Sequence, residues 1–190
     1  MCCSSFGMNV HDPFFAEFLL NPRFINLAEA VLGHKVVSQH VQYFSKPPGI
    51  GRATPSHQDG FYFCLVPNEA VSFWIPLDEI DQENGALRYW KGSHKLGLLP
   101  HGASHVLGFS QGMQEGSKVD LGEEVVCRVK RGDCLFHHSL MVPAADGNPS
   151  KRLRRAVGSV YYAERAKVDP EASRAYMESA LSQWKAKSLA

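Results

Sequence analysis

A series of short segments rich in β-branched and aromatic residues runs through the chain, and glycine, proline or other turn-forming residues separate them. Segments of this kind are typical of β-strands in an antiparallel fold. The expected strands cover residues 35–44, 56–65, 71–77, 86–90, 125–129, 133–138 and 156–162. The pattern therefore predicts a mainly β core.

Helices are expected at both ends of this core. Asp12 and Asn21 each precede a proline, the arrangement of an N-cap followed by the first helical residue, and Gly33 ends the second helix. Asp169 also precedes a proline and opens an amphipathic segment, which should pack outside the strands. Between the strands, residues 83–85 read as a tight turn and residues 91–113 as a long loop of the kind that often covers an active site.

Composition limits the classes of protein that the chain can belong to. With 190 residues, of which 44% are hydrophobic and 21% charged, it has the make-up of one globular domain. A formal net charge of +1 gives no field that would attract nucleic acid or an anionic membrane, so neither is an expected partner. Five cysteines without metal-like spacing, and no secretory apolar segment, favour a reduced, cytoplasmic location.

His57 and Asp59 carry the clearest chemical signal. On the expected strand 56–65, residues two apart project from the same face, so an imidazole and a carboxylate could share one metal ion. With a second histidine from elsewhere, this pair makes the open site that holds Fe(II) for oxygen chemistry. Taken alone the pair is a weak signal, because a surface strand with solvated side chains has the same pattern.

Other motifs accompany this pair in a fixed order along the chain. They are His57-Gln58-Asp59, Trp74-Ile75-Pro76-Leu77, Glu83-Asn84-Gly85-Ala86-Leu87, Gly92-Ser93-His94-Lys95, Gly132-Asp133, and Asn148-Pro149-Ser150 before Arg154. Together they resemble the phytanoyl-CoA dioxygenase family of iron- and 2-oxoglutarate-dependent oxygenases. The resemblance extends from about residue 12 to residue 162, which makes it far more specific than the first motif alone.

The resemblance implies a double-stranded β-helix, or jelly roll, with flanking α-helices. It also implies Fe(II) bound by His57 and Asp59, with 2-oxoglutarate as cosubstrate and Arg154 gripping its distal carboxylate with two parallel hydrogen bonds. Trp74 and Gln42 match positions that line the cosubstrate pocket, although core packing would explain Trp74 and an outward strand position would explain Gln42. The implied reaction is hydroxylation of a small organic or acyl substrate, with release of succinate and CO2.

One departure from the family pattern affects the metal site. The family's second histidine ligand precedes the oxoglutarate arginine at a fixed spacing, and Pro143 stands at that position here. Proline has no side-chain donor. His137 shares strand parity with position 143 but should lie roughly 20 Å away along a continuous strand, and His138 points to the other face. We therefore expect neither to replace the ligand unless a bulge or a refolded strand end brings it to the metal.

The N-terminus differs from the family as well. Members generally carry further residues before the segment that resembles residues 12–33, so the expected organisation is a single domain over residues 1–190 that lacks them. Three functional hypotheses remain: an oxygenase, a relative that binds 2-oxoglutarate or another carboxylate without turnover because of Pro143, or a different jelly-roll protein such as a metal-dependent isomerase or a sugar-binding module. No motif identifies the substrate.

Overall fold

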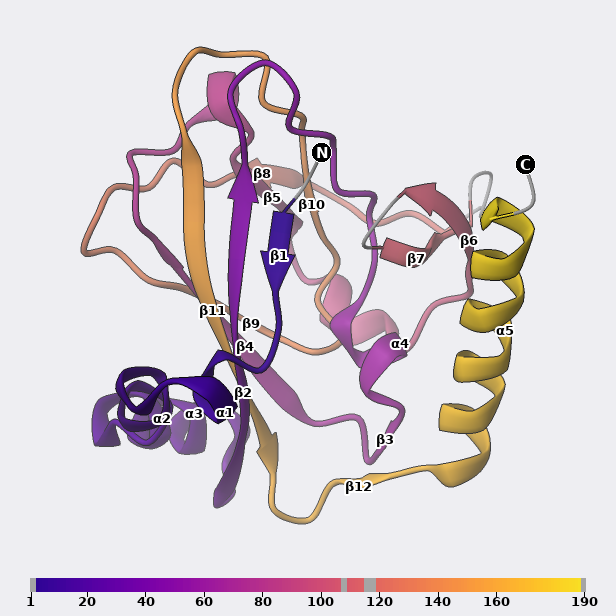
Figure 1. Cartoon of the computed structure of the whole chain (residues 1–190). Helices are drawn as coiled ribbons and strands as arrows, with labels where there is room; N and C mark the ends of the chain where they lie inside the picture. Colours follow the sequence, from indigo (N-terminus) through magenta and orange to yellow (C-terminus); the bar gives the residue numbers. More distant parts are fainter. Residues whose placement is uncertain (1–2, 107–108, 115–118, 189–190) are drawn as a thin grey trace.

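The computed structural model describes residues 3–106, 109–114 and 119–188, and its main feature is a set of antiparallel sheets (Figure 1). The largest sheet has five strands in the order β1-β2-β11-β4-β9. Their bounds are Cys3–Ser5, Val36–Lys46, Arg154–Ala163, Ala70–Pro76 and Leu135–His138, in that order. A three-stranded sheet, β10-β5-β8, is formed by Pro143–Ala145, Leu87–Trp90 and Glu124–Val126.

Two strand pairs complete the β structure. Strands β3 (Leu65–Val66) and β12 (Lys167–Val168) pair with each other, as do β6 (His101–Val106) and β7 (Phe109–Met113). The expected antiparallel strands are thus confirmed in their main part, whereas the fold as a whole is a mixed one of helices and sheets.

Three helices, α1 (Met8–His11), α2 (Pro13–Leu19) and α3 (Pro22–Leu32), gather at one end of the large sheet (Figure 1). The predicted caps are present. The Asp12 side chain accepts a hydrogen bond from the backbone N–H of Phe14, and Asn21 accepts one from that of Arg23. Gly33 ends α3 with φ 70°, in the left-handed region that favours glycine.

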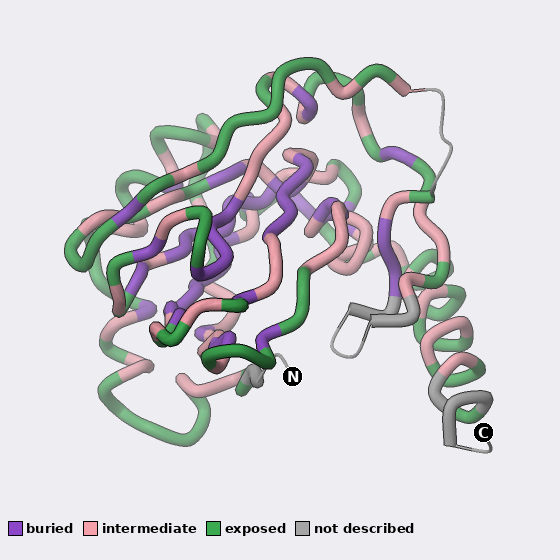
Figure 2. Tube along the Cα trace, turned by 90° about the horizontal axis from the view of Figure 1, so that it is seen from above, coloured by how far each residue is buried: buried purple, intermediate pink, exposed green. Residues whose placement is uncertain are grey.

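The main core lies between these helices and the large sheet. Ala28 of α3 and Val41, Val71, Phe73 and Tyr161 of the sheet are almost completely shielded from solvent. Figure 2 shows the same arrangement along the chain, with buried segments inside and exposed ones at the rim. Because side chains alternate along a strand, the opposite face of β11 and β2 is left to line a cavity.

The expected strand over residues 56–65 is wrong. Residues Asp59–Phe63 form the short helix α4, which Cys64 ends with φ 50°. Long-range hydrogen bonds explain the difference, because the Gly60 N–H donates to the Ser139 carbonyl and the Gly60 carbonyl accepts from the Asn68 amide. Local β propensity is overridden by these tertiary contacts.

The segment 91–113 is more ordered than expected. It contains a 3-10 helix, Ser93–Leu96, and then strands β6 and β7. The predicted turn at residues 83–85 is confirmed, because the 3-10 helix Gln82–Asn84 is followed by Gly85 with φ 89°. The expected strand 125–129 is shorter, ending at Val126.

The last helix, α5 (Pro170–Ser188), lies on the other side of the molecule from α1–α3 (Figure 1). Its N-cap Asp169 accepts a hydrogen bond from the Glu171 N–H, as the sequence predicts. The ring of Tyr176 on α5 makes edge contacts with Phe61 and Tyr62 of α4. None of the helices described is long and apolar enough to cross a membrane.

Candidate active site

A cavity of about 440 Å³ lies between the two larger sheets and α4. Its lining includes all five residues that the sequence analysis assigns to the site, namely Gln42, His57, Asp59, Trp74 and Arg154. His137 and Pro143 line it as well. Residues that lie more than a hundred positions apart in the sequence, such as Gln42 and Arg154, therefore share one pocket.

His57 lies in the extended segment before α4, and its ring is held by a local contact. The Nδ1 atom is 2.8 Å from the Pro55 carbonyl oxygen. Because a carbonyl only accepts hydrogen bonds, Nδ1 carries a hydrogen and donates it to this oxygen. The other ring nitrogen, Nε2, faces Asp59, 3.4 Å from Oδ1. The hydrogen bond at Nδ1 thus directs Nε2 towards the carboxylate.

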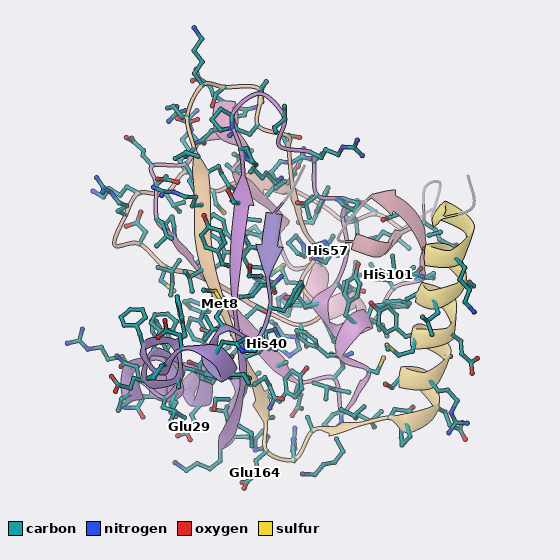
Figure 3. The ribbon with its side chains drawn as sticks, in the orientation of Figure 1. Met8, Glu29, His40, His57, His101 and Glu164 are labelled. Atoms are coloured by element: carbon teal, nitrogen blue, oxygen red, sulfur yellow. The ribbon has the colours of Figure 1, made fainter. Side chains whose placement is uncertain are left out.

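Gln58, between these two residues, is completely buried and fixes the segment. Its side-chain amide donates to the carbonyls of Gly97 and Leu140 and accepts from the Leu99 N–H. Its backbone N–H donates to Nε2 of His101. Figure 3 shows His57 and His101 close to α4, between the large sheet and α5. No local sequence pattern predicts this role of Gln58, because its partners are remote in sequence.

Asp59 is the first residue of α4 and is surrounded by donors. Its Oδ2 accepts a hydrogen bond of 2.5 Å from the Ser72 hydroxyl and lies 3.1 Å from Nε2 of His137. Burial by itself raises the pKa of the Asp59 carboxyl, but hydrogen bonds from His137 and His57 and the charge of these rings hold the pKa well below its ordinary value. Asp59 is therefore an anion under ordinary conditions.

The expectation that His137 lies far from the site is wrong. It assumed one continuous strand from residue 137 to residue 143, but β9 ends at His138 and the chain turns before β10 begins at Pro143. The Met141 N–H donates to the His138 carbonyl within this turn. As a result His137 reaches Asp59, whereas the Nδ1 atom of His138 accepts from the Leu140 N–H.

Pro143 nevertheless lies at the site, beside His57. Its carbonyl oxygen accepts a hydrogen bond of 3.2 Å from the His57 N–H, and the residue lines the cavity from β10. The position that the family pattern assigns to a histidine is thus next to the candidate ligands but offers them no side-chain donor.

Arg154 projects into the cavity from the start of β11 and is only 3% exposed. Its Nε donates to the Gly85 carbonyl at 3.1 Å, and its guanidinium carbon lies 4.5 Å from the centre of the Trp74 ring. The other two basic residues of this run point elsewhere, since Arg152 pairs with Asp81 and Arg155 with Asp78. Of these three arginines, only Arg154 lines the cavity.

The donor set suits a divalent transition metal in its chemistry. Two neutral imidazole nitrogens and a carboxylate are the ligands of open Fe(II) sites, and the His57 ring already has the hydrogen-bonded Nδ1 that such ligands use. Among the residues that the structure describes, no set of three histidine, cysteine, aspartate or glutamate side chains is already spaced to hold a metal ion.

Aromatic rings form much of the remaining cavity wall. They include those of Phe44, Tyr62, Phe63, Tyr162 and Tyr176. A polar floor with His57, Asp59 and Arg154 and an apolar wall is the usual arrangement of a pocket that orients an organic molecule over a few polar groups.

Comparison with known proteins agrees with this arrangement. The family model for phytanoyl-CoA dioxygenase (PhyH) matches residues 5–156. The chain belongs to this family. The peroxisomal phytanoyl-CoA dioxygenase of Bos taurus is 30% identical over 153 residues, which are 75% of this chain and 44% of the bovine protein. The chain therefore spans less than half the length of that relative.

Solved structures of related fold extend the comparison. The epimerase SnoN, in complex with Fe3+, alpha ketoglutarate and nogalamycin RO, has a TM-score of 0.77 at 21% identity, with 89% of this chain and 66% of SnoN covered. EvdO2 from Micromonospora carbonacea var. aurantiaca, complexed with 2-oxoglutarate, has a TM-score of 0.73 at 26% identity, with 90% of this chain and 70% of EvdO2 covered. The family assignment and the fold are thus consistent, and α5 lies beyond the residues that the family model matches.

Proposed function

We propose that this chain is an Fe(II)- and 2-oxoglutarate-dependent oxygenase that hydroxylates a small organic or acyl substrate, and that its two larger sheets form the double-stranded β-helix of such enzymes. The observation that carries the proposal is that His57, Asp59 and Arg154 line one cavity. The family match and the 2-oxoglutarate complex of EvdO2 support it.

In this proposal each polar residue has a distinct role. His57 and Asp59 hold the metal, which with 2-oxoglutarate and O2 supplies the oxidation of a C–H bond and converts the keto acid to succinate and CO2. Arg154 binds the distal carboxylate of 2-oxoglutarate, and Trp74 keeps the guanidinium plane in place through their stacked contact. Gln42 borders the same pocket from β2.

The aromatic wall would exclude water and bind the apolar part of the substrate. Tyr62 and Phe63 lie on α4, the same short helix that begins with Asp59. A substrate that contacts these rings would therefore lie next to the metal. The wall favours a substrate with an apolar body, and its placement near the metal provides the proximity that the reaction requires.

A second candidate is a relative that binds 2-oxoglutarate without turnover. The specific observation in its favour is Pro143, which stands where the family pattern has a ligand. This candidate keeps the Arg154 pocket but predicts weak affinity for Fe(II).

Anaerobic calorimetry separates the two. An oxygenase should bind Fe(II) at micromolar concentration together with 2-oxoglutarate, and then form succinate when O2 is admitted. Binding of 2-oxoglutarate without metal dependence would support the second candidate. Binding of neither would reject both and leave a different jelly-roll function.

A further inference from the structure

We propose that His137 supplies the third protein donor to the metal, in place of the histidine that the family pattern puts at position 143. This inference rests on the proposed function, because it assigns a ligand to the same metal. The site then has two imidazoles and one carboxylate. The second imidazole comes from residue 137 and not from position 143.

The contacts of the Asp59 carboxylate carry the argument. One of its oxygens, Oδ1, lies 3.4 Å from Nε2 of His57, and the other, Oδ2, lies 3.1 Å from Nε2 of His137. Both rings therefore present the same type of nitrogen to the same group. The side chains of His57 and His137 are each only 8% exposed, so this is an enclosed polar cluster and not a surface coincidence.

The second ring nitrogen of His137 has a hydrogen-bond partner, as that of metal-bound histidines usually does. Its Nδ1 lies 3.0 Å from the hydroxyl of Tyr89, which can accept an N–H hydrogen bond. Metal-binding histidines usually donate their second ring nitrogen to such a partner, which fixes the tautomer and the ring direction. His57 makes the equivalent contact with the Pro55 carbonyl. Each imidazole is thus oriented by its own hydrogen bond.

The backbone also holds His137 in place. Strand β9 pairs with β4 so that His137 is the register partner of Ser72, and the Ser72 hydroxyl donates to the same Asp59 oxygen. His138, one residue later, has its Nδ1 occupied by the Leu140 N–H and is absent from the cavity lining. Of the two histidines on β9, only His137 is placed to act at the site.

The three side chains already meet around one carboxylate. Each imidazole contacts a different oxygen of Asp59 through its Nε2 atom, so the three polar groups are directed at one another and not at solvent.

The test uses the full chain and two substitutions at one position. His137→Phe removes the donor and the hydrogen bond, whereas His137→Gln keeps a hydrogen-bond donor for Asp59 but is a poor iron ligand. His138→Phe is the matched control on the same strand. Loss of a residue that only hydrogen-bonds to a metal ligand lowers metal affinity about 10- to 100-fold. In an anaerobic titration with Fe(II), both His137 variants should lose more affinity than this. The control should keep its affinity.

A spectroscopic measurement identifies the ligands directly. In the Co(II)-loaded protein, each metal-bound imidazole that keeps an N–H gives a separate, strongly shifted proton resonance. We expect two such resonances in the unmodified chain and in His138→Phe, and one in His137→Phe. Adding Pro143→His to His137→Phe should restore the second resonance and recover Fe(II) affinity.

The outcomes are distinct. If His137→Gln binds Fe(II) as the unmodified chain does, or if the unmodified chain shows a single shifted resonance, His137 only positions Asp59 and this inference is overturned while the proposed function stands. If the unmodified chain binds neither Fe(II) nor 2-oxoglutarate, the proposed function fails instead. Thermal unfolding of each variant with a chelator present separates loss of the ligand from loss of the fold.

Discussion

The guanidinium carbon of Arg154 lies 4.5 Å from the centre of the Trp74 ring, and its Nε donates to the Gly85 carbonyl. These two contacts fix the plane and one edge of the guanidinium group. A contact of two parallel hydrogen bonds with a carboxylate requires this, because both nitrogens must face the ligand at once. β11 and β4, the strands that carry Arg154 and Trp74, are neighbours in the large sheet, so the sheet itself sets this geometry.

The first prediction concerns Arg154→Lys. Lysine keeps the charge but lacks the planar fork, so 2-oxoglutarate affinity should fall about 10- to 100-fold, as expected for loss of a hydrogen bond between charged groups. Calorimetry with a redox-inactive metal such as Mn(II) measures it. Arg152→Lys is the matched control, because Arg152 pairs with Asp81 at the surface. Equal affinity of the two variants would remove Arg154 from the cosubstrate site.

A second prediction uses Gly85→Ala. Gly85 has φ 89°, and a Cβ there would lie 2.7 Å from the Asp146 carbonyl oxygen. The strain should lower the free energy of unfolding by about 1–3 kcal/mol, and displacement of the Gly85 carbonyl should also weaken 2-oxoglutarate binding. Urea unfolding and calorimetry measure the two effects.

Gly33→Ala is the control for this strain. Gly33 has a similar φ of 70°, but nothing lies within 4 Å of its Cβ position. It should lose about 1–2 kcal/mol of stability and keep its affinity for 2-oxoglutarate. If both glycine variants bind the keto acid equally well, the turn at residues 82–85 does not position Arg154.

The third prediction tests Gln58. In Gln58→Leu, the carbonyls of Gly97 and Leu140 and the Leu99 N–H lose their partner inside the protein. Each unpaired buried group costs about 1–3 kcal/mol, so the variant should be destabilised by about 3 kcal/mol or more. Urea unfolding should show a much smaller change for Gln82→Leu, since Gln82 is exposed. A small change in both would mean that Gln58 does not fix the segment carrying His57 and Asp59.

The fourth prediction is a pH dependence at Asp78. Hydrogen bonds from the Arg155 side chain, aided by its backbone N–H and charge, hold the pKa of the Asp78 carboxyl below its ordinary value of about 3.9. A carboxyl whose pKa is lowered by folding stabilises the protein above the unfolded pKa, and that contribution disappears as the pH falls through the folded pKa.

Asp78→Asn should therefore lower the free energy of unfolding at pH 7, and lower it less at pH 2. Because the Arg155 side chain is 40% exposed, solvent screens the pair and the difference at pH 7 should be about 0.5–1 kcal/mol. Denaturant unfolding at the two pH values checks this. The same difference at both would show that the pair does not act through its charge.

The sequence predicted those parts of the fold that depend on local signals. Asp12, Asn21 and Gly33 define helix ends through contacts with their immediate neighbours, and the long strands β2 and β11 have clear β-prone composition. The strand predicted around Asp59 was wrong because the backbone of Gly60 bonds to Ser139, far along the chain, and to the side chain of Asn68 beyond the end of the segment. Such contacts leave no local pattern.

The site divides in the same way. The motifs and their spacing were sufficient to predict that Arg154 and Trp74 line the same pocket as His57. They were insufficient for His137. The chain turns after His138, so the distance from His137 to the site is shorter than a continuous strand would make it. No sequence pattern indicated a role for Ser72 or Tyr89. Their roles follow from the hydrogen bonds that they make with Asp59 and His137 in the structure.

Helix α4 joins two parts of the chain that the family model treats differently. Its first residue, Asp59, belongs to the polar floor of the cavity, while Tyr62 one turn later contacts Tyr176 of α5, beyond residues 5–156 that the family model matches. A substitution at Tyr176 would therefore change the aromatic wall around Tyr62 and leave the residues that contact Asp59 as they are.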